Sequence, residues 1–177
     1  MNALANPNVG QYLNRHFVSG FQKVATFQLI AGQKQGGNVA AYFCTPEGRV
    51  LHAIAGPVDA DTFLREAHWA NETYQLAQLD NLAPAGLQTF FRKAHLKRLQ
   101  REHNLHLTEA RLPRADAVST KLLDELLVRN QHLGLTNPGK THLLLAVGPL
   151  PRLNQVYRVV FERILNEQIA TDPVAGR

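Results

Sequence analysis

The fold of this chain is decided by the stretch Val39-Ala-Ala-Tyr-Phe-Cys44-Thr-Pro-Glu-Gly48-Arg-Val-Leu-His-Ala-Ile-Ala55. Two runs of β-forming side chains, 39–44 and 49–55, flank the turn Thr45-Pro46-Glu47-Gly48. In that turn proline fixes one φ angle and glycine supplies a positive one. Because the connection is so short, the two strands must be antiparallel, and the sequence predicts a β-hairpin.

A helix is expected directly after this hairpin. Asp59 or Asp61 can cap it by accepting a hydrogen bond from free backbone N–H groups. The helix would then bury a stripe of apolar side chains over about four turns, formed by Phe63, Ala67, Ala70, Tyr74 and Ala77.

The residues before the hairpin predict a helix, a strand and a loop. Val9, Leu13 and Phe17 are spaced four apart, which indicates one face of a helix over 8–17. Residues 22–30 contain mostly β-forming side chains and predict a strand. The segment 32–38 holds three glycines and is interpreted as a turn or loop.

Residues 39–67 resemble the last hairpin and helix of a thioredoxin-like domain. They share its apolar strand, Pro-x-Gly turn, second apolar strand, glycine and Asp-led helix beginning near Phe63-Leu64. Residues 6–9 and 12–18 resemble the stretch behind the active-site helix in thioredoxin-like proteins of the thiol:disulfide-reductase kind. The resemblance covers about residues 1–78. It implies an α/β fold with a thioredoxin-like mixed sheet.

The elements that carry redox catalysis in that family have no match in this sequence. The family's cis-proline falls at about Val39, and cis peptide bonds belong essentially to proline. The single cysteine, Cys44, can form neither a CxxC motif nor an internal disulfide. In redox-active relatives the CxxC would lie a few residues before the position of Met1. The chain could therefore act as an oxidoreductase only if an upstream extension supplied two cysteines.

The second half of the chain predicts helices and one further strand. Amphipathic helices are expected over 85–103, 117–133 and 151–168, and an apolar strand over 141–147. The last strand and helix, with Gly148-Pro149-Leu150-Pro151 between them, resemble the family's opening strand and active-site helix. We expect 141–147 to complete the sheet beside 22–30 and 39–44, as in a permuted fold. The alternative is an edge strand packed beside the helices.

Positive charge is concentrated in the second half. The net charge of +5 divides into −1 for residues 1–80 and +6 for residues 81–177, so an anionic partner would meet the second half. The basic helix 85–103 carries five candidate contacts for phosphates or an acidic protein, namely Arg92, Lys93, Lys97, Arg98 and Arg101. No aromatic residues interleave with them for base stacking, and a solvated basic face is the alternative interpretation.

Three further motifs can be weighed against simpler structural roles. The segment 134–141 matches the phosphate-loop pattern GxxxxGK[ST], but it follows a predicted helix and precedes a predicted strand, the reverse of the required order. Cys44 is a candidate reactive thiol, although a buried small side chain is the commoner role. His103 and His106, flanked by Glu102 and Glu109, could share a metal only if the helix continued beyond Asn104.

These observations predict a single-domain α/β protein that acts without catalysis as a protein-binding or scaffold module. A thiol:disulfide oxidoreductase missing its CxxC segment is the first alternative. Binding of an anionic surface or nucleic acid through 85–103 is the second. We expect neither a cofactor nor a metal. We also expect no membrane span, because no stretch approaches the roughly 20 apolar residues that a span needs. No signal peptide is recognisable, and a cytoplasmic location is expected.

Overall fold

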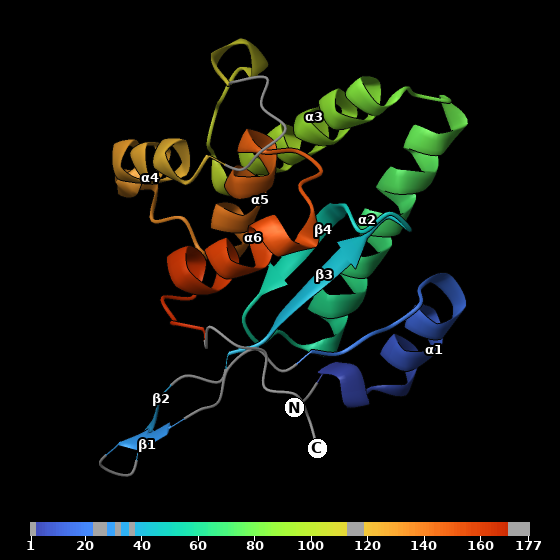
Figure 1. The fold of residues 1–177 in the computed structure, drawn as a ribbon, viewed down its shortest axis with the longest axis vertical. Helices are drawn as coiled ribbons and strands as arrows, with labels where there is room; N and C mark the ends of the chain where they lie inside the picture. The colour runs from blue at the N-terminus through green and yellow to red at the C-terminus, as the bar shows by residue number, and fades with distance from the viewer. Residues whose placement is uncertain (1–2, 23–27, 31–32, 36–37, 113–118, 170–177) are drawn as a thin grey trace.

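The computed structural model describes residues 3–22, 28–30, 33–35, 38–112 and 119–169 (Figure 1). The described residues form a mixed α/β protein in which helices predominate, with small antiparallel sheets of two strands each. Its elements are η1 Ala3–Ala5, α1 Pro7–His16, β1 Gln28–Ile30, β2 Gln33–Gln35, β3 Ala40–Cys44, β4 Val50–Ala55, α2 Ala60–Leu79, α3 Pro84–His103, η2 Glu109–Arg111, α4 Thr120–Arg129, η3 Gln131–Leu133, α5 Asn137–Val147, α6 Leu153–Val159 and the π-helical turn η4 Val160–Ile164.

The hairpin predicted from residues 39–55 is confirmed as β3 and β4. The strands pair in antiparallel register from Ala40 opposite Ala55 to Cys44 opposite Val50. Gly48 has φ +74°, and its N–H donates to the carbonyl oxygen of Thr45, which closes the turn. The register shifts between Phe43 and Cys44, so Leu51 is an extra residue in β4 and forms a β-bulge.

The helices predicted around the hairpin are also confirmed. Asp59 caps α2 by accepting a hydrogen bond from the backbone N–H of Thr62 at 2.7 Å. Four residues of the predicted stripe are buried, and Tyr74 is half-buried; the four are Phe63, Ala67, Ala70 and Ala77. Helix α1 packs against α2 and begins one residue before the expected start.

The prediction of a turn or loop over 32–38 is wrong at Gln33–Gln35, which forms β2 and pairs with β1. The three glycines lie on either side of Gln33–Gln35 and not within it. The backbone N–H and C=O groups of this tripeptide can therefore pair with another strand. A strand was predicted over 22–30, and its last three residues form β1. Residues 23–27 lie outside the described residues.

The strand predicted over 141–147 is wrong. These residues form the last two-thirds of helix α5, and every one of them is buried. A continuous apolar run fits a strand covered on both faces and equally a helix covered all round. Because these residues are helical, they do not pair with 22–30 or 39–44 as predicted. The alternative of an edge strand is wrong for the same reason. Within the described residues the strands pair only as two antiparallel hairpins.

The other helices follow the expected pattern, although two of the three are shorter than predicted. Helix α3 matches the predicted 85–103, and its buried residues are Phe91, Arg92, His95 and Leu99. The predicted helix 117–133 is α4 and η3, separated at Asn130; residues 113–118 lie outside the described residues. The predicted helix 151–168 spans α6 and η4 and ends at Ile164.

The hairpin of β3 and β4 lies between α2 and the C-terminal helices, as Figure 1 shows. One core cluster joins Phe43 and Ile54 to α1 and α2. A larger one joins Val50 and Ala55 to α3, α4, α5 and α6. Strand β4 is buried along its whole length, so polar side chains on it are held away from water. None of the described helices combines the length and apolar character needed to cross a bilayer.

Candidate metal centre

Three buried histidines meet where β4, α3 and α5 pack together. They are His52 on β4, His95 on α3 and His142 on α5, exposed by 2%, 1% and 0%. One ring nitrogen from each lies within 4.8 Å of the other two. We call these residues the three-histidine cluster. Two imidazole nitrogens bound tetrahedrally to one zinc ion are separated by roughly 3.3 Å, so the spacing is within reach of one ion.

The β-bulge of β4 fixes the second of these rings. The carbonyl oxygen of Leu51, the extra residue of the bulge, lies 3.0 Å from Nε2 of His95. A carbonyl can only accept, so the hydrogen-bond network assigns the proton of neutral His95 to Nε2. Nδ1 of His95 therefore accepts, and Nδ1–H of His142 donates to it at 2.8 Å, which places the lone pair of neutral His142 on Nε2.

A carboxylate holds His52 in a comparable way. Nε2 of His52 lies 3.0 Å from Oε2 of Glu66 on α2, which assigns the proton to Nε2 and the lone pair to Nδ1. Glu66 in turn pairs through both oxygens with the guanidinium of Arg98 on α3. Arg98 also donates two hydrogen bonds of 2.8 Å to Glu102.

The cluster contains ring nitrogens that lack hydrogen-bond partners among the described residues. They are Nδ1 of His52 and Nε2 of His142, and Nε2 of the nearby His103 is buried in the same way. A buried polar atom without a partner costs about 1–3 kcal/mol. Two of these three atoms, Nδ1 of His52 and Nε2 of His142, belong to the three-histidine cluster.

Burial keeps the three rings neutral. It lowers the pKa of His95 to about 3 and that of His142 well below the usual value, and the positive charge of Arg98 adds to both shifts. Burial also lowers the pKa of His52, although the hydrogen bond to Glu66 opposes the shift. Neutral imidazole is the form that binds metal ions, so ligation would need no deprotonation near pH 7.

Trp69 of α2 covers the cluster. Its indole lies 5.0 Å from His52, 5.1 Å from His95 and 5.6 Å from His142, measured between ring centroids. The guanidinium of Arg98 lies 5.0 Å from the centre of the same indole, a cation–π contact. Trp69 is the only tryptophan of the chain, so its fluorescence reports on this site alone.

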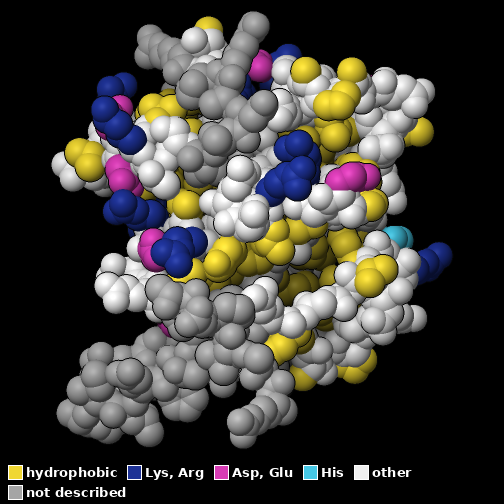
Figure 2. All heavy atoms as spheres, in the orientation of Figure 1, with side chains coloured by type: hydrophobic (Ala, Val, Ile, Leu, Met, Phe, Trp, Pro, Cys, Tyr) yellow, Lys and Arg dark blue, Asp and Glu magenta, His cyan; other side chains and the backbone are white. Residues whose placement is uncertain are grey.

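The structure separates the five basic residues predicted as anionic contacts. Arg92 is buried and donates to the carbonyl oxygens of Ala146 and Val147 at the end of α5. Arg98 belongs to the pair with Glu66 described above. Lys93 pairs with Glu109 at 3.8 Å, whereas Lys97 and Arg101 are exposed. On the face seen in Figure 2, basic side chains are interspersed with acidic ones and form no continuous basic surface.

Cys44 lies at the end of β3 and is half-buried. Burial raises the pKa of its thiol, which disfavours the reactive thiolate. The environment fits the structural role of a small apolar side chain, and the proposal of a reactive thiol gains no support from it.

The phosphate-loop pattern lies at the start of α5. Asn137–Val147 is helical, so the predicted strand after the motif was wrong, and the described residues just before it, 119–136, contain α4 and η3 rather than a strand. The hydroxyl of Thr141 donates to the carbonyl oxygen of Asn137, and the Gly139 backbone packs against the ring of His103. Both residues serve the packing of α5, and the arrangement does not form a phosphate cradle.

The pair His103 and His106 does not form a ligand set. Helix α3 ends at His103, as the sequence predicted, and Asn104 adopts the left-handed conformation with φ +51°. His106 lies beyond that end and is exposed.

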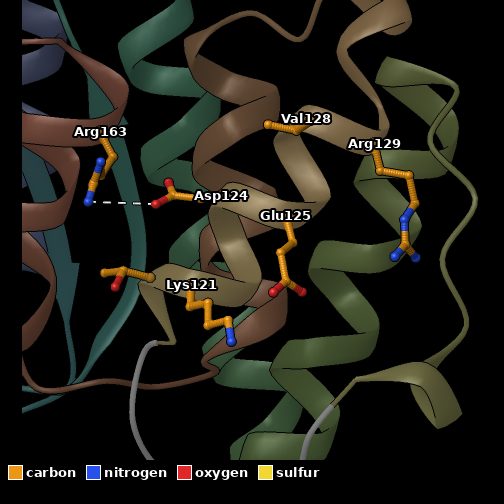
Figure 3. Close-up of a pocket in the computed structure, with 7 residues that line it drawn as sticks. Lys121, Asp124, Glu125, Val128, Arg129 and Arg163 are labelled. Carbon is orange, nitrogen blue, oxygen red and sulfur yellow. Dashed lines mark ion pairs between the residues drawn. The ribbon is translucent and has the colours of Figure 1, made fainter.

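A shallow pocket on α4 offers no comparable chemistry. Its volume is about 740 Å³, and Figure 3 shows its lining by α4 residues and Arg163. Arg163 and Asp124 form an ion pair of 3.6 Å across it, with side chains 52% and 41% exposed. Charges that are this accessible to water interact weakly.

Comparison of the chain with protein-family models, curated proteins and solved structures gives no match. The thioredoxin-like resemblance of residues 1–78 therefore stays a prediction.

The three-histidine cluster was missed because its members lie in separate elements. His95 and His142 are 47 residues apart, and short-spacing motifs such as HExxH find ligands only within one helix or turn. The sequence did hold a weaker signal. His52 stands in a predicted buried strand, and His95 lies one turn after Phe91 on the predicted basic helix.

Proposed function

We propose that this chain is a metal-binding module whose three-histidine cluster holds one transition-metal ion without catalysing a reaction. The observation that carries the proposal is the convergence of His52, His95 and His142 within 4.8 Å in the core. Two of these rings present a nitrogen that lacks a hydrogen-bond partner in the described structure. A metal ion would satisfy such nitrogens, because a neutral imidazole binds through its lone pair.

The donor set favours a borderline metal ion over a hard one. Imidazole nitrogen suits zinc, copper, nickel and iron, whereas magnesium and calcium prefer oxygen ligands. Zinc is the natural first candidate, since three histidines are a common part of its coordination. The negative charge of Glu66 is already balanced by Arg98, which leaves three neutral donors for the ion.

The burial of the cluster supports a structural role. All three rings are at most 2% exposed, so substrate access is poor, and the ion would link β4, α3 and α5. A protein that is tied together in this way suits the binding or scaffold function predicted from the sequence, which remains part of the proposal. The oxidoreductase and anion-binding alternatives draw no comparable support from the site.

The test is metal titration of the full chain after removal of metal with a chelator. We expect Zn²⁺ and Co²⁺ to bind at one ion per chain, with a dissociation constant below about 1 µM, and to change Trp69 fluorescence. Isothermal titration calorimetry and elemental analysis measure the affinity and the stoichiometry. Mg²⁺ should not compete.

Matched variants separate the cluster from the other histidines. His95→Gln and His142→Gln should each weaken binding by more than about 100-fold, because only two ligands remain. His106→Gln removes an exposed imidazole and should leave the affinity unchanged. Failure of the wild-type chain to bind Zn²⁺, Co²⁺ or Cu⁺ would contradict the proposal, as would equal loss in the His106 variant.

A further inference from the structure

Glu66 lies between the three-histidine cluster and solvent-facing charges. Its residue is 8% exposed, and its Oε2 lies 3.0 Å from Nε2 of His52. On its other side Arg98 pairs with both carboxylate oxygens, one of them at 2.9 Å. Arg98 is itself held by Glu102, whose side chain is 43% exposed. A continuous chain of charge-assisted hydrogen bonds thus runs from the surface to the first ring.

This arrangement keeps Glu66 ionised and fixed. Both carboxylate oxygens accept hydrogen bonds from the Arg98 guanidinium, and Oε2 also lies 3.0 Å from Nε2 of His52, so the carboxylate is held on two sides by donors. A permanent acceptor beside Nε2 restricts neutral His52 to the tautomer with its proton on Nε2. The Nδ1 lone pair is then the only one that His52 can offer to an ion.

We propose that Glu66 is the positioning residue of the metal centre, orienting His52 for ligation through Nδ1 while Arg98 keeps the carboxylate out of the ligand set. The inference rests on the metal-binding function proposed above. Carboxylates that accept the second N–H of a ligating histidine fix the ring orientation and raise its basicity as a ligand. His95 has an equivalent acceptor in the Leu51 carbonyl, so the two rings are oriented independently.

Direct ligation by Glu66 fits the structure less well. Oε2 interacts with both His52 and Arg98, and Oε1 with Arg98 and, at 3.7 Å, with Arg65. Moving Glu66 onto an ion would break the paired hydrogen bonds to Arg98 and leave that guanidinium half-buried without its main partner. The geometry therefore favours an outer position for the carboxylate.

The experiment compares Glu66→Gln with Glu102→Gln in Zn²⁺ and Co²⁺ titrations of the full chain. Glu66→Gln should weaken binding about 10–100-fold and shift the visible absorption bands of bound Co²⁺, because His52 becomes a less well oriented donor. Glu102→Gln changes an equal charge on the outer side of Arg98 and should alter affinity less than about fivefold.

The tautomer of His52 gives a second readout that needs no variant. Long-range ¹H–¹⁵N spectra of the wild-type chain should show the proton of His52 on Nε2 both without metal and with Zn²⁺ bound. Ligation through Nε2, or unchanged affinity and Co²⁺ spectrum in Glu66→Gln, would overturn the role of Glu66 while leaving metal binding intact. Absence of metal binding in the wild-type chain would instead overturn the proposed function and this inference together.

Discussion

Helix α2 separates two groups of histidines that differ in almost every physical respect. On its inner side, Trp69 covers the three-histidine cluster. On its outer side, His68 stacks on Tyr12 of α1 with ring centroids 3.9 Å apart, and His16 lies 4.5 Å from the same tyrosine ring. We call His16, His68 and Tyr12 the surface cluster.

The difference shows that surroundings, rather than residue type, give a histidine its chemistry. The inner rings are shielded from water, have low pKa values, and two of them keep a nitrogen without a partner in the described structure. The outer rings are exposed. Water can satisfy their nitrogens, so the surface cluster has no need of a ligand. Four predictions test this contrast, in order of decreasing expected effect.

The largest effect is expected on acidification of the metal-free chain. The inner histidines bind protons in the unfolded state below pH 6.5, but His95 resists protonation in the folded state down to about pH 3. Stability is therefore full above pH 6.5 and falls as the pH decreases, by on the order of 5 kcal/mol for His95 over its whole range. Urea unfolding between pH 7 and 5, where ordinary carboxyls stay ionised, measures the first part of this loss, about 2 kcal/mol from His95. His16→Gln/His68→Gln should keep the same slope; a flat wild-type profile would contradict the assignment of neutral buried rings.

The second effect is stabilisation by metal. Saturating Zn²⁺ at about 1,000 times the dissociation constant should raise the free energy of unfolding by about 4 kcal/mol. Thermal or urea unfolding with and without Zn²⁺ measures the gain, and a chelator should reverse it. The surface variant His16→Gln/His68→Gln should gain as much as the wild type, and a smaller gain would place the ion on the surface cluster.

The third effect concerns the charges that support each cluster. Arg98→Met keeps an apolar stem beside Trp69 but leaves the buried carboxylate of Glu66 without its main partner, which should cost roughly 2–4 kcal/mol. Glu72→Gln removes the exposed pair with His68, 3.7 Å long, and should cost less than about 1 kcal/mol. Urea unfolding of both variants at pH 7 gives the comparison, and equal losses would argue against it.

The smallest effect is expected within the surface cluster. The amide of Asn71 donates to the hydroxyl of Tyr12 at 3.2 Å, and Tyr12→Phe removes that hydroxyl while keeping the stacked ring. The free energy of unfolding should fall by about 0.5–1.5 kcal/mol. Zn²⁺ affinity should not change, and a change would link the two clusters across α2.

Much of the first half of the fold could be predicted from local signals. The Thr45–Gly48 turn, the Asp59 cap and the stripe on α2 depend on backbone angles, free N–H groups and side-chain spacing within a few residues of each other. These effects act before any tertiary contact forms, so the hairpin and α2 were predicted correctly.

Helix α5 was not predictable by the same means. Its run from Leu143 to Val147 is apolar on every side because α3, α4, β4 and η4 surround it. The amphipathic period that distinguishes a helix from a buried strand is absent when no face meets water. Arg92 and His95 escaped prediction for a related reason, since polar residues on α3 were assigned to its solvated face.

The sequence by itself determined the hairpin of β3 and β4, the helix α2 that follows it, the single thiol and the positive charge of the second half. Only the tertiary structure decided which polar side chains are buried and which of them meet. The three-histidine cluster brings together residues from three elements, with His95 and His142 separated by 47 positions, and no local rule links their side chains. The desolvation of a side chain depends on where it lies in the folded core. The lowered pKa values and the partnerless nitrogens of these histidines therefore arise only when β4, α3 and α5 pack together.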